Sequence, residues 1–415
     1  MNALAPGLLA TILFWRILFA VALFGTFSST VFLFMTLVAS WRYRGNAAKD
    51  KTAAASVSNS SLPPVTILKP VHGMEPRLLE NLESFFCQDY PDFEVVFGAR
   101  EAGNEALQVV AELRRRYPGV KCKVVLSGPP EWPNAKVFSL EKMIAASAND
   151  YLIISDSDVQ VAPDFLRNIV PPLLDRKVGL VTCIYQGVPA PSFTSGLEAL
   201  GMSVEMSSGV IVADMLEGMR FALGPVMATR RDALEKIGGI RATADYYSDD
   251  FVLGNLVWAA GYKVTLSHYI VRHVLVPQSF ARTFGHQLRW MKSTRFSRPL
   301  GHFGSGLTFA VPFGVLGFIV AAMLGHPIFG GALLVASLLN RMIQSLVVGW
   351  GITHDSRALR YFWLYPLRDL FGFITWAGSY TSGAFLWRGE IYHFSKGGRI
   401  IAQERPAASA MASQP

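Results

Sequence analysis

The chain has 415 residues, of which 51% are hydrophobic and 16% are charged, and its formal net charge is +8. This balance is too apolar for an ordinary soluble protein. The positive charge does not indicate nucleic-acid binding, because the basic stretch after residue 250 leads directly into apolar segments. The three cysteines lack paired or metal-binding spacing, which argues against a disulfide framework or a structural zinc site.

The first predicted element is a membrane anchor. Residues 17–39 carry no charge, and this length is enough to cross a bilayer as a helix. The run is too long for a signal peptide, and Trp41–Arg44 is typical of a membrane interface. We predict an anchor over residues 1–41 and a linker over residues 42–64. Lys and Arg residues after the anchor place the next domain in the cytosol.

Residues 65–300 are predicted to form this cytosolic domain. Short apolar segments alternate with segments of helical periodicity. The predicted strands are residues 65–68, 93–97, 123–126 and 151–155, and the predicted helices are residues 76–86, 106–117 and 137–148. This alternation predicts an α/β domain with a mostly parallel sheet, whose ligands bind at the carboxyl ends of the strands. Because GxGxxG and P-loop motifs are absent from the sequence, dinucleotide and P-loop binding are not indicated.

Two aspartates follow the fourth predicted strand. Asp156 and Asp158 are two residues apart, so they point to one side of an extended chain. Their oxygens suit Mg²⁺ or Mn²⁺, ions that also bind diphosphates. The alternative is a turn with solvated acids, since Asp and Ser are common turn residues.

A second acidic pair, Asp249 and Asp250, precedes a predicted helix over residues 251–260. The N-terminus of a helix stabilises ionised carboxylates. An ionised carboxylate in a cleft is a competent general base toward a hydroxyl group. Helix capping is the alternative, but capping needs only one of the two acids.

An amphipathic helix is predicted over residues 280–298. Its apolar residues form one stripe: Phe280, Phe284, Leu288 and Met291. Its basic residues lie on the opposite face: Arg282, His286 and Arg289. This pattern is typical of a helix at a membrane interface. Two interpretations remain open, namely cations that hold a departing diphosphate and a surface that binds lipid headgroups.

Residues 301–390 contain three apolar segments. Residues 307–324 and 328–350 are predicted to span the membrane. The third segment, residues 361–387, contains Arg368 and Asp369, which are costly inside a bilayer. We therefore expect it to re-enter, to lie in the interface or to hold these charges against other helices. Residues 391–415 are predicted to be a tail.

Arg341 lies inside the second of these apolar segments, where a charge is also costly. Three explanations remain open. The guanidinium pairs with Asp369, contacts a lipid phosphate or reaches the interface along its flexible stem.

The order of these features resembles a known family of enzymes. The Asp156/Asp158 motif, the acidic pair and His286–Trp290 are similar to the signature of family-2-type inverting glycosyltransferases, which ends in [Q/R]xxRW. Residues 67–73, ILKPVHG, resemble the LKPxxG opening of the ceramide glucosyltransferase family. Residues 134–136 resemble its Asn-x-Lys element. The likeness runs from about residue 65 to residue 298 and includes bacterial relatives linked to hopanoid glycosylation.

The resemblance implies a GT-A type nucleotide-sugar-binding domain with transmembrane helices at both ends. It also implies a role for each matching residue. Asp250 is the expected catalytic base, and Asp156 and Asp158 are the expected ligands of Mg²⁺ or Mn²⁺. The expected nucleotide-sugar contacts are Lys69, Asn104, Lys136 and Asp156. The expected contacts to the diphosphate or the acceptor are Asp249, His286, Gln287, Arg289 and Trp290.

Two positions depart from the family pattern. Asn104 stands where the family has an aspartate that contacts the nucleoside, which changes a donor contact. His286 stands where the family has Gln or Arg, and histidine donates to phosphate most strongly when protonated.

The implied activity is transfer of a hexose to a lipid hydroxyl with inversion, at the cytosolic face of the membrane (the plasma or inner membrane in a bacterium). The expected donor is UDP-glucose and the expected acceptor is ceramide, with no nucleic-acid partner. One alternative is transfer from UDP-N-acetylglucosamine to a hopanoid or diacylglycerol. Another is a processive polysaccharide synthase, which needs more spans. A non-enzymatic lipid carrier would leave both acidic pairs without a role.

Overall fold

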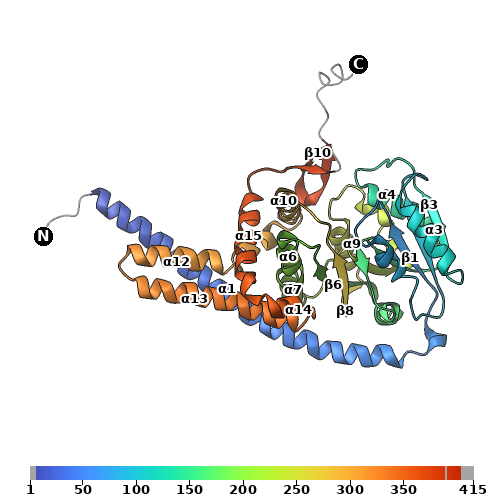
Figure 1. Ribbon diagram of the computed structural model, residues 1–415, viewed down its shortest axis with the longest axis horizontal. Coiled ribbons are helices and arrows are strands. Elements are labelled where there is room, and N and C mark those ends of the chain that lie inside the picture. The colour runs from blue at the N-terminus through green and yellow to red at the C-terminus, as the bar shows by residue number, and fades with distance from the viewer. Residues whose placement is uncertain (1–5, 388–389, 403–415) are drawn as a thin grey trace, which may run out of the picture.

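The computed structural model describes residues 6–387 and 390–402, and it has two parts (Figure 1). One part is a globular α/β body, and the other is an arm of long helices that projects from it. Helix α1 (Pro6–Ser56) begins in the arm and continues along the underside of the body. Helices α12 (Val311–Met323) and α13 (Pro327–Gln344) pack against each other and against α1 in the arm.

The body is built on an eight-stranded sheet with the order β3-β2-β1-β4-β7-β6-β8-β5. The strands are β1 (Val65–Pro70), β2 (Phe93–Ala99), β3 (Lys121–Leu126), β4 (Tyr151–Ser155), β5 (Val159–Gln160), β6 (Val178–Val188), β7 (Val226–Arg230) and β8 (Lys263–Val274). Strands β1 to β4 are parallel, and so are β6 and β8. Strand β7 runs antiparallel between β4 and β6, and β5 runs antiparallel to β8. The predicted mostly parallel sheet is confirmed.

Apolar side chains are buried on both faces of this sheet. Ile67 and Leu68 of β1, for example, are fully buried in two different hydrophobic clusters. Such strands read as continuous apolar runs, which is the pattern that identified β1, β2 and β4 in the sequence. The helices around the sheet are α2 (Leu78–Glu83), α3 (Ala106–Arg116), α4 (Ala135–Ala146), α5 (Phe165–Ile169), α6 (Phe193–Leu200), α7 (Ser207–Glu217), α8 (Arg231–Lys236) and α9 (Asp249–Ala259).

Within the described residues, three helices are long and apolar enough to cross a membrane: Ala10–Thr52, Phe193–Glu217 and Pro327–Trp350. The second, which joins α6 and α7 through a π-helical turn, was not expected from the sequence, and it is largely buried in the protein. The segment predicted as a straight span over residues 307–324 differs from that prediction. Helix α11 (Pro299–Gly306) and α12 meet there at an angle of 47°, as a broken span or a re-entrant loop.

The last apolar segment does not form a helix long enough to cross a bilayer. It follows α14 (Ser356–Arg360), contains the 14-residue helix α15 (Tyr365–Gly378) and then continues into β9 (Ala384–Trp387). A spanning helix needs about 20 residues. The expectation that this segment does not cross simply therefore agrees with its structure.

Two segments that we expected to be irregular are regular. Helix α1 continues to Ser56, so the linker shortens to residues 57–64. The alanines and lysines of residues 47–55 favour helix, and Tyr43 fixes the helix by donating a hydrogen bond to the Ser267 carbonyl (3.0 Å). The predicted tail contains β10 (Glu390–Phe394) and β11 (Ile400–Ala402), which form an antiparallel sheet with β9. Residues 403–415 of that tail lie outside the described part.

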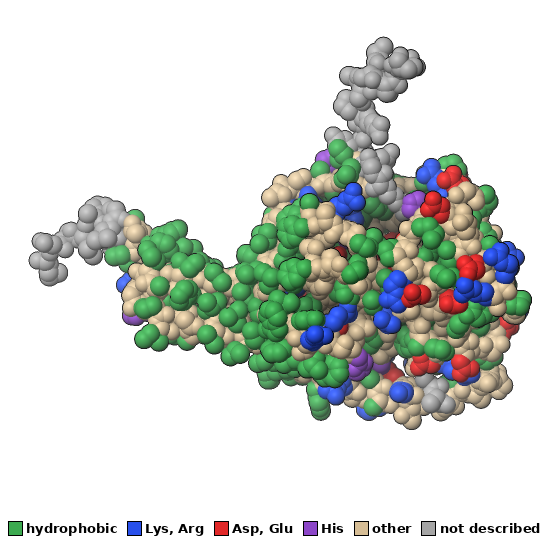
Figure 2. Space-filling model, viewed as in Figure 1, with side chains coloured by type: hydrophobic (Ala, Val, Ile, Leu, Met, Phe, Trp, Pro, Cys, Tyr) green, Lys and Arg blue, Asp and Glu red, His purple; other side chains and the backbone are tan. Residues whose placement is uncertain are grey.

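The surface also divides into two parts (Figure 2). Apolar side chains cover the arm and the adjoining side of the body, whereas charged side chains concentrate on the rest of the body. On α1, Phe27 is 68% exposed and Trp41 is 79% exposed. Exposed apolar surfaces of this extent mark an interaction with a partner or a membrane. The arm is therefore the part of the chain suited to a bilayer.

Candidate active site

The two acidic motifs of the sequence meet at the carboxyl end of β4. Asp250 lies in the first turn of α9, and its Oδ1 atom accepts a hydrogen bond from the Phe251 N–H (2.8 Å). A β-carbon added at Gly224 would lie 3.0 Å from Asp250 Oδ2 and 3.7 Å from Asp156 Oδ2. Both carboxylates therefore border the same small space, and a glycine between them keeps that space open.

Helix α4 presents a lysine between these carboxylates. The Lys136 ammonium lies 2.7 Å from Asp156 Oδ1 and 3.7 Å from Asp249 Oδ2. Asn134 caps this helix by accepting hydrogen bonds from the Lys136 and Val137 N–H groups. The amide of Asn134 donates to the Tyr246 carbonyl (2.9 Å) and to Asp249 Oδ1 (3.4 Å). The predicted Asn-x-Lys element thus connects both acidic loops.

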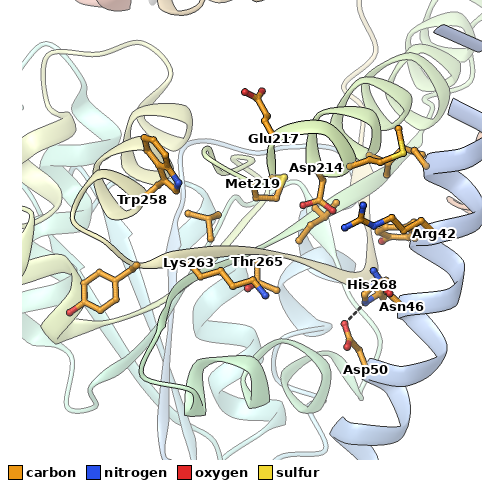
Figure 3. A pocket seen from close by; sticks show the side chains of 18 of the residues that line it. Arg42, Asn46, Asp50, Asp214, Glu217, Met219, Trp258, Lys263, Thr265 and His268 are labelled. Atoms are coloured by element: carbon orange, nitrogen blue, oxygen red, sulfur yellow. Dashed lines mark ion pairs between the residues drawn. The ribbon is translucent and has the colours of Figure 1, made fainter. Parts of the chain in front are cut away.

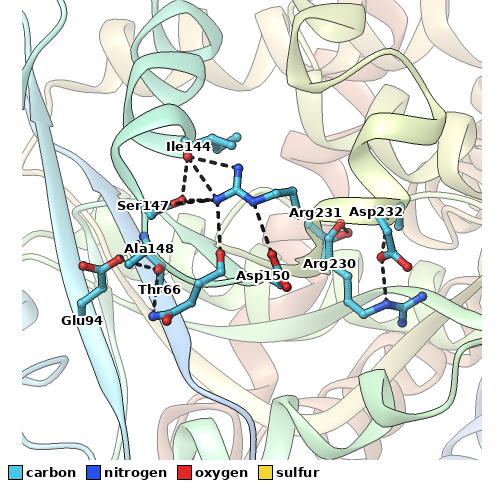
Figure 4. A network of polar contacts seen from close by, with 12 residues as sticks. Thr66, Glu94, Ile144, Ser147, Ala148, Asp150, Arg230, Arg231 and Asp232 are labelled. Atoms are coloured by element: carbon cyan, nitrogen blue, oxygen red, sulfur yellow. Dashed lines mark hydrogen bonds and ion pairs between the residues drawn. The ribbon is translucent and has the colours of Figure 1, made fainter.

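The opposite end of α4 is held by a separate polar network (Figure 4). Arg231 donates to the Ile144 carbonyl (3.3 Å) and to the hydroxyl group of Ser147 (2.8 Å), and it pairs with Asp150 at 3.6 Å. The carboxylate of Glu94 accepts from the Ala148 N–H (2.7 Å) in the same region. These contacts fix the C-terminal end of α4 and therefore the direction in which its N-terminal end presents Lys136.

Asp158 lies on the other side of the motif. Its Oδ2 atom is 3.5 Å from His273 Nε2, at the end of β8. Its Oδ1 atom is buried and has no hydrogen-bond partner among the residues that the structure describes. Ser157, between the two aspartates, donates a hydrogen bond to Glu75 Oε2 (2.7 Å). No sequence motif points to His273 or Glu75, because they belong to other segments of the chain.

The charges in this cleft shift one another's ionisation. Burial, together with the negative charge of Asp249, raises the pKa of Asp250 to about 6, although Lys136 acts in the opposite direction. Burial also raises the pKa of Asp158, and His273 partly offsets this. Burial opposes the charge on Lys136, but Asp156 and Asp249 outweigh it and raise the pKa of the lysine. Several carboxylates thus share one lysine, which leaves the cleft attractive to a further cation.

Two residues that are predicted to bind the donor, Lys69 and Asn104, form hydrogen bonds within the protein. Lys69 is completely buried, and it donates hydrogen bonds to the hydroxyl group of Ser155 (3.3 Å) and to the backbone carbonyl of Asp156. Burial lowers the pKa of Lys69 to about 7. Lys69 thus holds the backbone at Asp156, and its expected contact with the donor stays a prediction.

Asn104 connects the loop after β1 with the start of α3. Its side-chain oxygen accepts hydrogen bonds from the Gly73 N–H (3.1 Å) and the Ala106 N–H (3.0 Å). These contacts account for an asparagine at this position on structural grounds. Its predicted contact with the nucleotide remains a prediction.

The predicted amphipathic helix is α10 (Phe280–Ser297), and its polar face packs into the protein. Phe280 is 59% exposed, whereas Thr283 and Gln287 are buried. Gln287 donates to Glu198 Oε1 (3.1 Å) and accepts from Arg368 Nη2 (3.2 Å). Gln287 thus connects α10 to α6 and α15.

The other residues of the HQLRW motif point to different neighbours. His286 Nδ1 lies 3.6 Å from Glu198 Oε1, and its ring contacts Trp290 with centroids 4.3 Å apart. Arg289 donates to the Tyr247 hydroxyl group (2.7 Å) and to the Leu386 carbonyl (3.3 Å). Tyr247 stands two residues before Asp249, so Arg289 is anchored next to the acidic pair. The second anchor, Leu386, lies in β9 at the end of the third apolar segment.

A cavity of about 440 Å³ begins at Asp250 and extends toward the arm. Ser248, Phe251 and Trp290 line it near the acidic pair. Phe32 of α1 and Arg341 of α13 line it on the side of the apolar helices. The cavity therefore connects the acidic cleft with the part of the molecule suited to a bilayer.

Arg341 and Asp369 form an ion pair in the wall of this cavity. Their closest atoms are 3.3 Å apart, and both side chains are buried. Asp369 also accepts hydrogen bonds from the Ala310 and Val311 N–H groups (3.0 and 2.8 Å). Of the explanations for Arg341 that the sequence left open, pairing with Asp369 is confirmed.

A second cavity, of about 750 Å³, lies between α1, the end of α7 and β8 (Figure 3). Arg42, Asp214 and Lys263 point into it, and an ion pair between Asp50 and His268 (2.7 Å) closes one side. Its described lining residues differ from those of the acidic cleft. This cavity marks the place where the continuation of α1 attaches to the body.

Comparison with known proteins identifies the family of the chain. The family model "Glycosyl transferase family 21" matches residues 21–400. The chain therefore belongs to glycosyl transferase family 21. This membership confirms the predicted enzyme class, a glycosyltransferase, and the mostly parallel sheet with Asp156 and Asp158 after β4 agrees with the predicted GT-A type fold.

Individual relatives are distant. The chain is 22% identical over 351 residues to Ceramide glucosyltransferase 3 of Caenorhabditis elegans, covering 83% of this chain and 75% of that protein. It is 25% identical over 233 residues to Ceramide glucosyltransferase 1 of the same organism, covering 56% of this chain and 50% of that protein. Among solved structures, it is similar to the mannosyltransferase PcManGT from Pyrobaculum calidifontis in complex with GDP-Man and Mn²⁺, at 18% identity and a TM-score of 0.47. That match covers 86% of this chain and 97% of the other.

Proposed function

We propose that this protein transfers a hexose, with glucose from UDP-glucose as the first choice, to the primary hydroxyl group of a membrane lipid, with ceramide as the first choice. The observation that carries the proposal is the cavity with Asp250 at one end and Phe32 and Arg341 of the apolar helices at the other. A lipid in the bilayer can bring its hydroxyl group to Asp250 through this cavity while its chains remain among the helices.

The proposed reaction is a single displacement with inversion at the anomeric carbon. The acceptor oxygen forms a bond to that carbon, the bond from the carbon to the UDP oxygen breaks, and Asp250 takes the hydroxyl proton. A pKa of about 6 suits this role, because the carboxylate is ionised at neutral pH and is still basic enough to accept the proton. The neighbouring Asp249 contributes to this value through its negative charge.

Asp156 and Asp158 are the proposed ligands of Mg²⁺ or Mn²⁺. The buried and unpartnered Oδ1 atom of Asp158 fits a cation, as does the excess of carboxylates over lysines in the cleft. Within residues 6–387 and 390–402, no three side chains of His, Cys, Asp or Glu form a metal-binding group. The diphosphate of the donor would therefore supply further oxygen ligands. Such an ion would neutralise the negative charge of the departing diphosphate.

Lys136 and the HQLRW motif are proposed to bind the donor and to orient the acceptor. Lys136 is partly exposed beside Asp156, so its ammonium is available to a phosphate oxygen. Arg289 and His286 are the proposed contacts for the departing diphosphate, and Trp290 lines the cavity used by the acceptor. We also propose that the body faces the cytosol, because Arg42, Arg44 and Lys49 follow the first apolar segment.

Transfer from UDP-N-acetylglucosamine to a hopanoid or diacylglycerol remains the alternative within the same chemistry. A processive polysaccharide synthase is less well supported, because the described part of the chain has three candidate spans, or four if the bent pair counts as one. A polysaccharide channel needs more helices than these.

Purified protein in detergent, with Mn²⁺ or Mg²⁺, tests the proposal. Labelled UDP-glucose and UDP-N-acetylglucosamine are offered separately with ceramide, diacylglycerol and a hopanoid alcohol. We expect glucosylceramide as the main product. An N-acetylhexosamine on another lipid would keep the mechanism and change the substrates, whereas no transfer to any lipid would refute the lipid acceptor.

A further inference from the structure

A second pair of opposite charges lies in the wall of the cavity that contains Asp250. Arg368 Nη2 is 3.1 Å from Glu205 Oε2, and both residues line the cavity. The geometry of this contact is not that of a hydrogen bond, so Glu205 Oε2 is buried without a hydrogen-bond partner in the described part of the chain. The Nε and Nη1 atoms of Arg368 are also buried there without a hydrogen-bond partner. The side chain of Glu205 is still 25% exposed.

The surrounding backbone is shaped to admit this pair. A β-carbon at Gly201 would overlap the guanidinium of Arg368. A β-carbon at Gly372 would lie 3.1 Å from Glu205 Oε2 and 3.2 Å from Arg368 Nη1. Two glycines from different helices thus leave room for the two side chains.

The helix that carries Glu205 is also distorted at this point. Residues Gly201–Met206 form a π-helical turn between α6 and α7. Single π-helical turns inside α-helices are rare and occur frequently at functional sites. The turn lies in a helix that is otherwise apolar enough to cross a membrane.

A buried ion pair of this kind is not explained by stability. Removing charges from water costs more than most buried pairs return, and apolar residues of similar size often stabilise the same position. Arg341 and Asp369 show a more complete arrangement nearby, in which backbone N–H groups satisfy the carboxylate. Glu205 and Arg368 instead keep unused hydrogen-bonding capacity in the cavity.

We propose that Glu205 and Arg368 bind the polar groups of the acceptor that neighbour its reacting hydroxyl group. An ionised carboxylate only accepts hydrogen bonds and a guanidinium only donates them. The matching acceptor therefore carries both a donor and an acceptor close to the hydroxyl group, as an amide or a second hydroxyl group does. A lipid whose remaining polar groups are esters has no hydrogen to donate to Glu205.

The pair is also connected to the HQLRW motif. Arg368 donates to Gln287, and Gln287 donates to Glu198, which lies beside His286. An acceptor bound to Glu205 and Arg368 is therefore linked through Gln287 to α10, the helix that the proposed function assigns to the diphosphate. This inference rests on the proposed function, because it concerns the same cavity and the same reaction.

The test compares two acceptors with matched short chains, an N-acyl amino diol and a 1,2-diacylglycerol. Both have a primary hydroxyl group, but only the first has further hydrogen-bond donors. We expect the wild-type protein to prefer the amino diol in kcat/KM by about 10- to 100-fold, the range for a hydrogen bond to a charged group. In Glu205→Gln we expect this preference to fall to less than about threefold, mainly through a higher KM for the amino diol.

A control variant and a stability measurement separate recognition from folding. Glu235→Gln removes an exposed glutamate from α8 and should keep the preference. If Glu205→Gln unfolds in detergent, the double variant Glu205→Leu/Arg368→Leu, which removes both charges together, replaces it and should show the same loss of preference. Equal use of both acceptors by the wild-type protein, or an unchanged preference in the folded variant, overturns the subsite. Absence of transfer to either lipid overturns the proposed function as well.

Discussion

Buried charges occur in two regions of this molecule, and the two regions are neutralised to different extents. In the cleft at the end of β4, Asp156, Asp249 and Asp250 surround the single ammonium of Lys136. One carboxylate oxygen of Asp249 has no hydrogen-bond partner among the described residues. This cleft therefore carries an excess of negative charge.

Beside the apolar helices, the charges of Arg341 and Asp369 are almost fully neutralised by their partners. Each carboxylate oxygen of Asp369 has a partner, either the guanidinium or two backbone N–H groups. Such a group holds α12, α13 and α15 together and has little capacity left for a ligand. The comparison supports the proposal that the incompletely neutralised cleft binds substrate and cation, whereas the fully neutralised pair is a structural contact.

Among the substitutions that test this comparison, Asp250→Asn has the largest expected effect on activity. It removes the proposed base and keeps the size of the side chain, so we expect transfer to fall by about 10²- to 10⁴-fold. Donor binding, measured by calorimetry with the UDP-sugar, should persist. Asp245→Asn, an exposed change in the preceding loop, is the matched control and should keep full activity. Wild-type turnover in Asp250→Asn would show that another group is the base.

The substitution Asp369→Asn tests whether the ion pair of Arg341 and Asp369 stabilises the fold. It leaves the charge of Arg341 buried and unpaired, so we expect a loss of about 3–5 kcal/mol in the free energy of unfolding. Thermal unfolding in detergent measures this loss. The double variant Arg341→Met/Asp369→Leu removes both charges and should recover most of the stability. If the single variant unfolds at the wild-type temperature, the pair is not structural.

The pH dependence of transfer tests the shifted pKa of Asp250. A base works only when it is deprotonated, so kcat/KM should be constant above pH 6 and should fall about tenfold for each pH unit below it. In Asp249→Asn the neighbouring negative charge is absent, so the pH at which kcat/KM begins to fall should be lower. If kcat/KM begins to fall at the same pH in Asp249→Asn as in the wild-type protein, Asp249 does not raise the pKa of Asp250.

The substitution Gly224→Ala has the smallest expected effect. The added methyl group would lie 3.0 Å from Asp250 Oδ2 and would push against that carboxylate, whereas its distance of 3.7 Å from Asp156 Oδ2 is an ordinary contact. We expect kcat to fall by about tenfold or less, as a small displacement of a reacting group does, with little change in the unfolding temperature. Gly196→Ala, where the added carbon meets nothing within 4 Å, is the control. Equal activity of the two variants would argue against a tight cleft at Gly224.

Local patterns in the sequence were sufficient for much of the body. Continuous apolar runs identified β1, β2 and β4 because both faces of these strands are buried, and helical periodicity identified α3, α4 and α10. The spacing of Asp156 and Asp158 after a buried strand predicted an acidic site at its carboxyl end. These features depend on neighbours in the chain, so a single sequence contains them.

Contacts between distant segments were decided only by the tertiary structure. Strand β7 enters the sheet antiparallel to β4 and brings Gly224 between Asp156 and Asp250. The packing of β1 beside β4 buries Lys69 and brings its ammonium to the backbone carbonyl of Asp156. Strand β9 and strand β10, which lies in the predicted tail, fold back onto α10 because Phe385 and Phe394 pack on Tyr247.

By itself, then, the sequence determined the class of fold, the apolar helices Ala10–Thr52 and Pro327–Trp350, and the residue types of the acidic cleft. Those properties follow from periodicity, composition and short spacing. Only the tertiary structure decided which carboxylates share a lysine, which charges remain without a partner and where the cavity runs. Burial and distance between segments far apart in the chain set these properties, and neither can be calculated from one segment at a time.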